Sequence, residues 1–228
     1  MLDALSPPVE ADPWRPIILA YTPAHGRDAL RALLALDDRL ANVLQTTREP
    51  ALGQIRLAWW REALGKLDSA PPPAEPVLAA LAEHVLPLGL RGGALADLVS
   101  GWDVLIEEEA LDDAALGRFA AGRGHLFTLA GTILRAGASD PVTAAGQGWA
   151  LADLARHIDN AEDRSRASGL AQEPLARATR TRWTRNGRAL GAMAHVARLD
   201  LAQMVGEGER RASPGHVGRL LWHRMTGY

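Results

Sequence analysis

The sequence predicts an all-α fold, a single-domain bundle of about eight helices. Along most of the chain, apolar residues recur at steps of three and four, which is the spacing that builds one face of a helix. Strands typically show an alternation of apolar and polar residues, or clusters of β-branched and aromatic residues. Both patterns are hard to find in this sequence. We expect residues 1–14 to form an N-terminal tail and residues 15–228 to form the helical domain.

The first two predicted helices cover 27–47 and 50–67. In the first, the stripe from Leu30 to Leu44 forms one apolar face, and most charged residues fall outside it. The second opens with Pro50, a residue type that suits the first helical turn. Its sequence is apolar on nearly every side, so we expect this helix to be buried on more than one face.

Six further helices are predicted from their start signals. Asp112 and Asp113 lie at a predicted helix start, where acidic side chains interact favourably with the positive end of the helix dipole. Pro141, Pro174 and Pro214 each follow an Asp, Glu or Ser, a pattern typical of helix starts. The predicted ranges are 75–86, 94–108, 112–135, 141–163, 174–204 and 214–225.

Composition excludes several classes of function. The 25 basic and 27 acidic residues give a formal charge of −2, so no basic excess indicates nucleic-acid binding. The absence of cysteine excludes disulfides, thiolate metal sites and a cysteine nucleophile. No apolar run approaches the length of a membrane span, and the first residues lack the basic segment of a secretory signal. We therefore expect a cytoplasmic protein, and peripheral contact with a membrane stays open.

Two charged clusters are candidates for function. Asp159 and Asp163 lie four residues apart, so both carboxylates would project from one helix face and could share a divalent cation. The alternative is a solvated helix end whose acids pair with nearby arginines. Five arginines between 177 and 188 spread around their predicted helix, which favours a solvated surface over an anion site, although a partner or lipid headgroups could use it. The seven histidines lack the spacing of a metal site.

The run from Glu49 to Leu64 is specific enough to indicate a family. It reads EPALGQIRLAWWREAL and resembles the squalene/phytoene synthase family, most closely the branch that contains mitochondrial complex I assembly factors and their bacterial relatives. The resemblance implies the all-α type I isoprenoid synthase fold, in agreement with the periodicity. Similarity extends through 27–43, 97–99, Asp103, 112–135 and 149–166.

The resemblance also implies a chemistry. The family's enzymes hold Mg²⁺ between two facing helices, each with a pair of acids, and the metal ions bind and ionise an allylic diphosphate. In this chain the acid positions of the first helix fall on Ala41 and Gln45, and those of the second on His157 and Ala161. Without these carboxylates, the metal ions would be under-coordinated and the leaving group poorly stabilised.

Other polar residues lie near the two motifs. Arg156 matches an arginine that faces the diphosphate in the enzymes, and Asp153 replaces the usual asparagine. Asp37 and Asp38 lie close to positions at which the enzymes carry a Cys-Arg pair.

We therefore predict a non-catalytic family member that needs no cofactor and acts in respiratory-complex assembly or in prenyl-lipid binding. Its partner would be a prenyl diphosphate, a prenyl lipid or a respiratory-complex subunit. Arg156 and Arg56 would contact a diphosphate, while Trp59 and Trp60 would anchor the core.

Two alternatives remain open. In the first, the chain is an active Mg²⁺-dependent prenyltransferase that joins prenyl diphosphates head to head. A register shift of two residues then makes Asp159, Glu162 and Asp163 the metal ligands, and Asp37 and Asp38 should turn into the same cavity. In the second, the chain is a helical adaptor whose cavity is closed by side chains.

Overall fold

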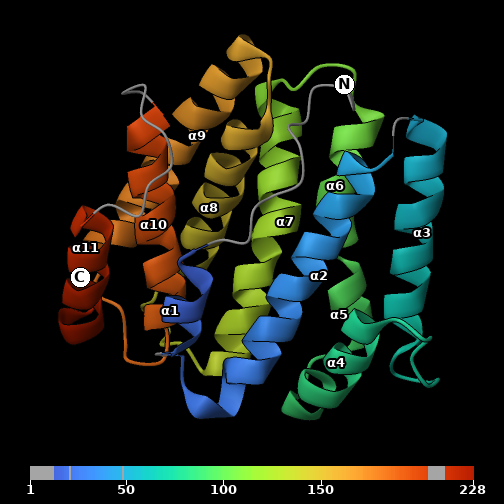
Figure 1. Ribbon diagram of the computed structural model, residues 1–228, viewed down its shortest axis with the longest axis horizontal. Helices are drawn as coiled ribbons and strands as arrows, with labels where there is room; N and C mark the ends of the chain where they lie inside the picture. Colours follow the sequence, from blue (N-terminus) through green and yellow to red (C-terminus); the bar gives the residue numbers. More distant parts are fainter. Residues whose placement is uncertain (1–12, 21, 48, 205–213) are drawn as a thin grey trace.

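Helices form all of the regular secondary structure in the described part of the chain, so the predicted fold class is confirmed (Figure 1). The computed structural model describes residues 13–20, 22–47, 49–204 and 214–228. Its α-helices are α1 (Arg15–Ala20), α2 (Arg27–Gln45), α3 (Pro50–Lys66), α4 (Pro76–His84), α5 (Gly92–Ala96), α6 (Val99–Glu107), α7 (Asp113–Leu134), α8 (Val142–His157), α9 (Ala161–Arg180), α10 (Arg188–Met204) and α11 (Pro214–Thr226). Two short 3-10 helices, η2 (Ala24–Gly26) and η3 (Leu86–Leu88), precede α2 and follow α4.

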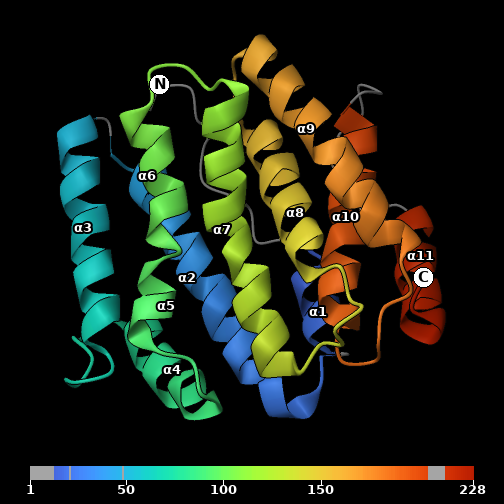
Figure 2. The same cartoon turned by 180° about the vertical axis from the view of Figure 1, so that it is seen from behind.

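Helix α8 lies inside the bundle, with α7, α9 and α10 packed around it (Figure 1). Helix α7 also packs on α6 and α2, and α10 packs on α11. Helices α3 and α11 lie at opposite ends of the longest dimension, as the two views agree (Figures 1 and 2). Among the described residues, no helix combines the length and the apolar character that crossing a membrane requires.

Glycines let the backbones of α6, α7 and α8 approach one another closely. A Cβ on Gly101 of α6 would lie 2.4 Å from the backbone nitrogen of Arg123 in α7. A Cβ on Gly146 of α8 would lie 2.3 Å from the carbonyl oxygen of Gly124 in α7. Because these positions lack side chains, α6 and α8 both pack against α7 beside Arg123.

The helix predicted over 141–163 is two helices, α8 and α9, with a break between them. Asn160 caps α9: its backbone is extended, and its side-chain oxygen accepts the backbone N–H groups of Glu162 and Asp163 at 2.9 and 3.1 Å. The predicted helix 94–108 is likewise divided, into α5 and α6.

The helix predicted over 174–204 is also wrong at its start. Pro174 lies inside α9, and the break falls later, between α9 and α10. In that break Trp183 is buried and donates its indole N–H to a carbonyl near the end of α9 at 2.8 Å. The carboxylate of Asp140 accepts the backbone N–H of Thr184 at 2.7 Å. These two side chains hold the segment in a non-helical turn.

Helix α3 is less buried than the sequence predicts. Leu57, Trp60 and Leu64 face the core, but Ile55 is 65% exposed and Trp59 is 44% exposed. The helix lies at the end of the bundle, where its outer face has no neighbour among the described helices (Figure 1). The prediction of a helix buried on more than one face is wrong, and Trp60 anchors the core while Trp59 does not.

The fold begins slightly earlier than the predicted domain. Residues 1–12 of the predicted tail lie outside the described residues. Trp14, which the sequence assigns to that tail, is buried, and its ring stacks on His216 of α11 with the ring centroids 5.0 Å apart. Trp14 therefore ties the start of α1 to the last helix.

Candidate functional site

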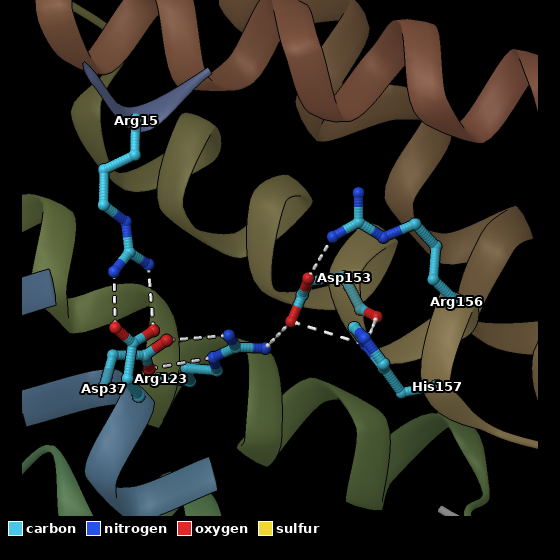
Figure 3. Close-up of polar contacts among 7 residues, drawn as sticks. Arg15, Asp37, Arg123, Asp153, Arg156 and His157 are labelled. Carbon is cyan, nitrogen blue, oxygen red and sulfur yellow. Dashed lines mark hydrogen bonds and ion pairs between the residues drawn. The ribbon is translucent and has the colours of Figure 1, made fainter. Parts of the chain in front are cut away.

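Five buried or half-buried charged side chains form a cluster at the centre of the bundle. They are Asp37 of α2, Arg123 of α7, Asp153 and Arg156 of α8, and Asp200 of α10. We call these five residues the ion-pair cluster; Figure 3 shows four of them. Charges at this depth are tolerated only when they are paired and hydrogen-bonded, so the contacts within the cluster decide what it can do.

Arg123 lies at the centre of the ion-pair cluster. Its Nε and Nη2 atoms donate to the two carboxylate oxygens of Asp37 at 3.0 and 2.7 Å, and its Nη1 donates to Asp153 at 2.7 Å (Figure 3). Its guanidinium also lies over the rings of Trp102 and Trp149, 4.6 and 4.4 Å from their centroids. All three nitrogens of this side chain therefore have a carboxylate partner.

Arg156 extends the cluster to α10. One of its terminal nitrogens donates to Asp153 and the other to Asp200. Asp200 also lies 3.3 Å from Nε2 of His216 in α11. A continuous series of ion pairs thus runs from α2 through α7 and α8 to α10, and its three carboxylates are nearly balanced by two guanidinium groups.

Electrostatic interactions hold the centre of the cluster in its charged form. Burial alone would raise the pKa of Asp153, but Arg123 and Arg156 outweigh it and lower that pKa well below its ordinary value. Burial likewise opposes the charge on Arg123, yet Asp37 and Asp153 raise its pKa. At Asp37 burial prevails and raises the pKa, against the opposing effect of Arg123. Arg123 and Asp153 therefore stay ionised at neutral pH.

A small hollow lies beside the cluster, between α1, α8 and α10. Trp149, Met193 and Val196 line its apolar side, and Asp153 and Arg156 line its polar side. Its volume is about 20 Å³, which suits about one water molecule. Pockets that enclose larger organic ligands measure roughly 300–1,000 Å³, so this hollow does not accommodate a prenyl chain.

The structure does not bring together the two arginines predicted to contact a diphosphate. Arg156 has both terminal nitrogens on carboxylates of the cluster. Arg56 lies on α3, at the end of the bundle, and donates to the hydroxyls of Thr46 and Thr47 at 3.0 and 2.6 Å. Arg56 therefore joins α3 to the end of α2, away from Arg156.

The three acids considered as metal ligands of an active enzyme lie outside the ion-pair cluster, around the start of α9. Asp159 and Glu162 are exposed, and Asp163 is half-buried. Glu162 accepts a hydrogen bond from Arg166, one turn along α9, at 2.9 Å. Within the described ranges, no group of three or more acids, histidines or cysteines is placed to hold a metal ion.

The two neighbouring acids on α2 point to different partners. Asp37 turns inward to Arg123, whereas Asp38 is half-exposed and accepts a hydrogen bond from Arg15 of α1 at 2.9 Å. Only Asp37 thus enters the centre of the bundle, where Arg123 joins it to Asp153 and not to Asp159.

The four positions aligned with the family's acids carry no carboxylate, and they differ in burial and in their contacts. Ala41 and Gln45 are partly buried on α2, and Ala161 is exposed at the first turn of α9. His157 is half-buried, with Nδ1 2.8 Å from the backbone oxygen of Asp153. Burial lowers the pKa of His157, which favours its neutral form.

Magnesium ions do not fit this set of donors. Mg²⁺ takes oxygen ligands in octahedral geometry, and a diphosphate bridge needs open carboxylates on both facing helices. Asp37 of α2 and Asp153 of α8 do face one another, but Arg123 lies between them and donates to both (Figure 3). The guanidinium supplies within the chain the positive charge that metal ions would otherwise bring.

Sequence reasoning missed Arg123 and Asp200, and did not place Asp37 and Asp153 together. A signal was nevertheless present, because Asp37 continues the buried series Leu30 and Leu33 at helical spacing. Arg123 likewise lies between buried Phe119 and Phe127 on α7. An ionisable side chain within an apolar stripe must find a buried partner, although the sequence does not say which one.

Comparison with known proteins identifies one family. The family model described as squalene/phytoene synthase matches residues 10–210, which is most of the chain. No curated protein and no solved structure matches the chain significantly.

Proposed function

Because the chain belongs to the squalene/phytoene synthase family, we propose that it is a non-catalytic member, a helical scaffold that acts in the assembly of a respiratory complex. The proposal has two parts. The first, that no diphosphate chemistry takes place, rests on the geometry of the ion-pair cluster. The second, the assembly role, rests on the resemblance of the Glu49–Leu64 run to assembly factors.

One observation carries the first part: Arg123 neutralises the carboxylates that face one another across the bundle. Its three nitrogens bind Asp37 and Asp153 at 2.7 to 3.0 Å. Removal of a guanidinium from such a buried pair leaves uncompensated charge and costs about 3–5 kcal/mol. An incoming Mg²⁺–diphosphate would have to displace this partner, so the ground state of the folded protein opposes metal binding.

Packing around the cluster favours assembly over prenyl-lipid binding. The hollow beside the cluster has a volume of about 20 Å³, and Trp149 and Met193 close its apolar side. A prenyl lipid held in a water-excluding cavity needs an enclosed space many times larger. A scaffold, by contrast, needs no such cavity.

The first test is diphosphate release from farnesyl or geranylgeranyl diphosphate with Mg²⁺ at neutral pH. We expect no release above the rate without protein, while an active synthase of the family serves as the positive control in the same assay. Steady release by the wild-type chain that is abolished by Asp159→Ala would overturn the proposal and favour the prenyltransferase alternative.

The second test addresses the assembly role in the native host. Deletion of the gene should lower the NADH:quinone oxidoreductase activity of the membranes and the amount of assembled complex. Wild-type protein and a variant with Asp159→Ala, Glu162→Ala and Asp163→Ala should restore both equally, because these acids have no role in a scaffold. Normal complex levels in the deletion strain would contradict the assembly role, while leaving the result of the diphosphate assay unaffected.

A further inference from the structure

The C-terminal helix α11 presents an apolar face to solvent. Val217, Leu221 and Met225 follow one another at four-residue steps, and Trp222 lies beside them; Met225 is 77% exposed and Trp222 is 55% exposed. Tyr228, just after the helix, is exposed as well. A contiguous exposed apolar patch of this kind marks a surface that another phase or molecule covers.

The opposite face of α11 accounts for its attachment to the bundle. His216, Leu220 and His223 are buried there, and Nε2 of His223 lies 3.0 Å from the backbone oxygen of Arg188 in α10. The inner face therefore already has its partner within the chain, and the outer apolar face is not required for folding onto α10.

Arginines border the apolar face on both sides. With about 100° between successive residues of a helix, Arg224 falls on one flank of the face and Arg219 on the other. From Pro214 to Tyr228 the chain has no acidic residue. Two further arginines hold the end of the helix: Arg182 donates to the backbone oxygen of Thr226 at 3.1 Å, and Arg188 to that of Arg224 at 2.6 Å.

This end of the molecule is strongly basic in a chain that is acidic overall. The segments 174–204 and 214–228 carry eight arginines and a single acid, Asp200, which is buried against Arg156. Their formal charge is +7, whereas the whole chain has a charge of −2. Helices α9 and α10 carry four of these arginines, two more lie in the segment between them, and α11 carries the remaining two. Figure 2 shows that α10 runs beside α11 at one end of the bundle and that α9 ends near it. A positive field therefore surrounds the apolar face.

We propose that α11 and the surrounding arginines dock the protein on a membrane surface rich in anionic lipid, with α11 lying in the plane of the headgroups. An apolar face bordered by arginines is the pattern of interfacial helices, and basic residues add attraction to anionic headgroups. Trp222 and Tyr228 are residue types that favour the membrane–water interface. A second copy docked through the same face would bring two +7 surfaces together, so charge disfavours self-association there.

This inference is independent of the proposed function and concerns a different part of the molecule. The test is flotation of the full chain with vesicles of phosphatidylcholine alone or of phosphatidylcholine and phosphatidylglycerol in equal amounts. We expect flotation with the anionic vesicles only, with binding that weakens as salt is raised.

Two variants separate the apolar and the electrostatic contributions. Leu221→Ser with Met225→Ser should reduce binding to anionic vesicles at least about tenfold. Arg180→Gln with Arg185→Gln should remove much of the preference for anionic lipid. All four side chains are exposed, so thermal unfolding should stay close to that of the wild type.

The exposed face of α3 supplies a matched control. Ile55→Ser with Trp59→Ser removes a similar apolar area at the opposite end of the bundle and should leave vesicle binding unchanged. Equal loss with this control, equal binding to both kinds of vesicle, or no binding at low salt would overturn the proposal. The proposal would also be overturned if the wild-type chain were a dimer and the double variant Leu221→Ser with Met225→Ser were a monomer. That result would assign the apolar face to a second copy of the chain.

Discussion

At the scale of single residues, Arg123 is a buried cation whose partners come from three other helices. Arg123 lies on α7 and contacts two carboxylates and two indole rings that belong to α2, α6 and α8. Its position depends on Gly122 and Gly124, because the absence of side chains at its two neighbours lets α6 and α8 come close enough to supply those partners. The same residue therefore joins four helices and blocks the carboxylates that a metal ion would need.

Substitution of Arg123 by Met should destabilise the fold by about 3–5 kcal/mol at pH 7, because it leaves buried Asp37 and Asp153 without their cation. Equilibrium unfolding in urea measures the loss. Arg15→Met is the matched control, since Arg15 pairs with half-exposed Asp38, and such pairs contribute at most about 1 kcal/mol. The difference in free energy of unfolding between Arg123→Met and the wild type should become smaller as the pH falls toward 5, because the unpaired carboxylates of the variant then take up protons. Equal losses in both Met variants would contradict this account.

Two buried histidines make stability depend on pH. The rings of His195 in α10 and His223 in α11 lie 4.7 Å apart, and burial lowers their pKa values to about 3 and about 4. Below about pH 6.5 the unfolded chain binds protons that the folded chain does not, so stability falls as the pH drops toward 4. Between pH 7 and pH 5 we expect a loss of about 2 kcal/mol for each histidine.

The variant His223→Gln isolates this effect, because glutamine does not titrate. Its free energy of unfolding should fall about 2 kcal/mol less than that of the wild type between pH 7 and pH 5. His25 is exposed, so His25→Gln serves as the control for a histidine-to-glutamine substitution at the surface. An unchanged pH dependence in His223→Gln would show that this histidine does not stay neutral in the folded protein.

At the scale of helices, the sequence predicted the elements whose ends carry strong local signals. Pro50 opens α3 as expected, and Asp112 caps α7 through the backbone N–H of Ala115 at 2.7 Å. The errors fall where tertiary contacts decide between similar local patterns. Pro174 resembles a helix start, yet it lies inside α9, and the next break lies where buried Trp183 and the Asp140 carboxylate hold the chain. Packing against distant residues cannot be read from local sequence.

The cap at the start of α9 allows a direct measurement of one such boundary. Asn160→Ala should cost about 1 kcal/mol in urea unfolding, because the N–H groups of Glu162 and Asp163 lose their acceptor. Asn160→Asp keeps an acceptor oxygen at the same position and should retain most of the stability. Equal stability of the alanine and aspartate variants would show that the cap does not fix this boundary.

At the scale of the whole molecule, three regions with different chemistry follow one another along the bundle. Helix α3 exposes Ile55 and Trp59 at one end, the ion-pair cluster fills the centre, and the basic end with α11 lies opposite (Figure 1). The sequence predicted the bundle as a whole, since helical spacing is a local property. It could not show that acids from α2, α8 and α10 converge on two arginines, because that arrangement depends on how helices distant in sequence pack.

A thermal-shift measurement distinguishes the centre of the molecule from its basic end. A ligand present at 100 times its Kd stabilises by about 2.7 kcal/mol, and in a chain of this size each kcal/mol raises Tm by roughly 2–4 °C. An intact metal–diphosphate site would therefore raise Tm by roughly 5–11 °C in saturating Mg²⁺ and pyrophosphate. We expect no Mg²⁺-dependent rise, because Arg123 already occupies Asp37 and Asp153.

Any rise caused by anion binding at the arginines near α11 should appear without Mg²⁺ and persist when Mg²⁺ is chelated. A rise that requires Mg²⁺ and is lost when Asp159, Glu162 and Asp163 are all replaced by Ala would instead place an active metal site at the start of α9.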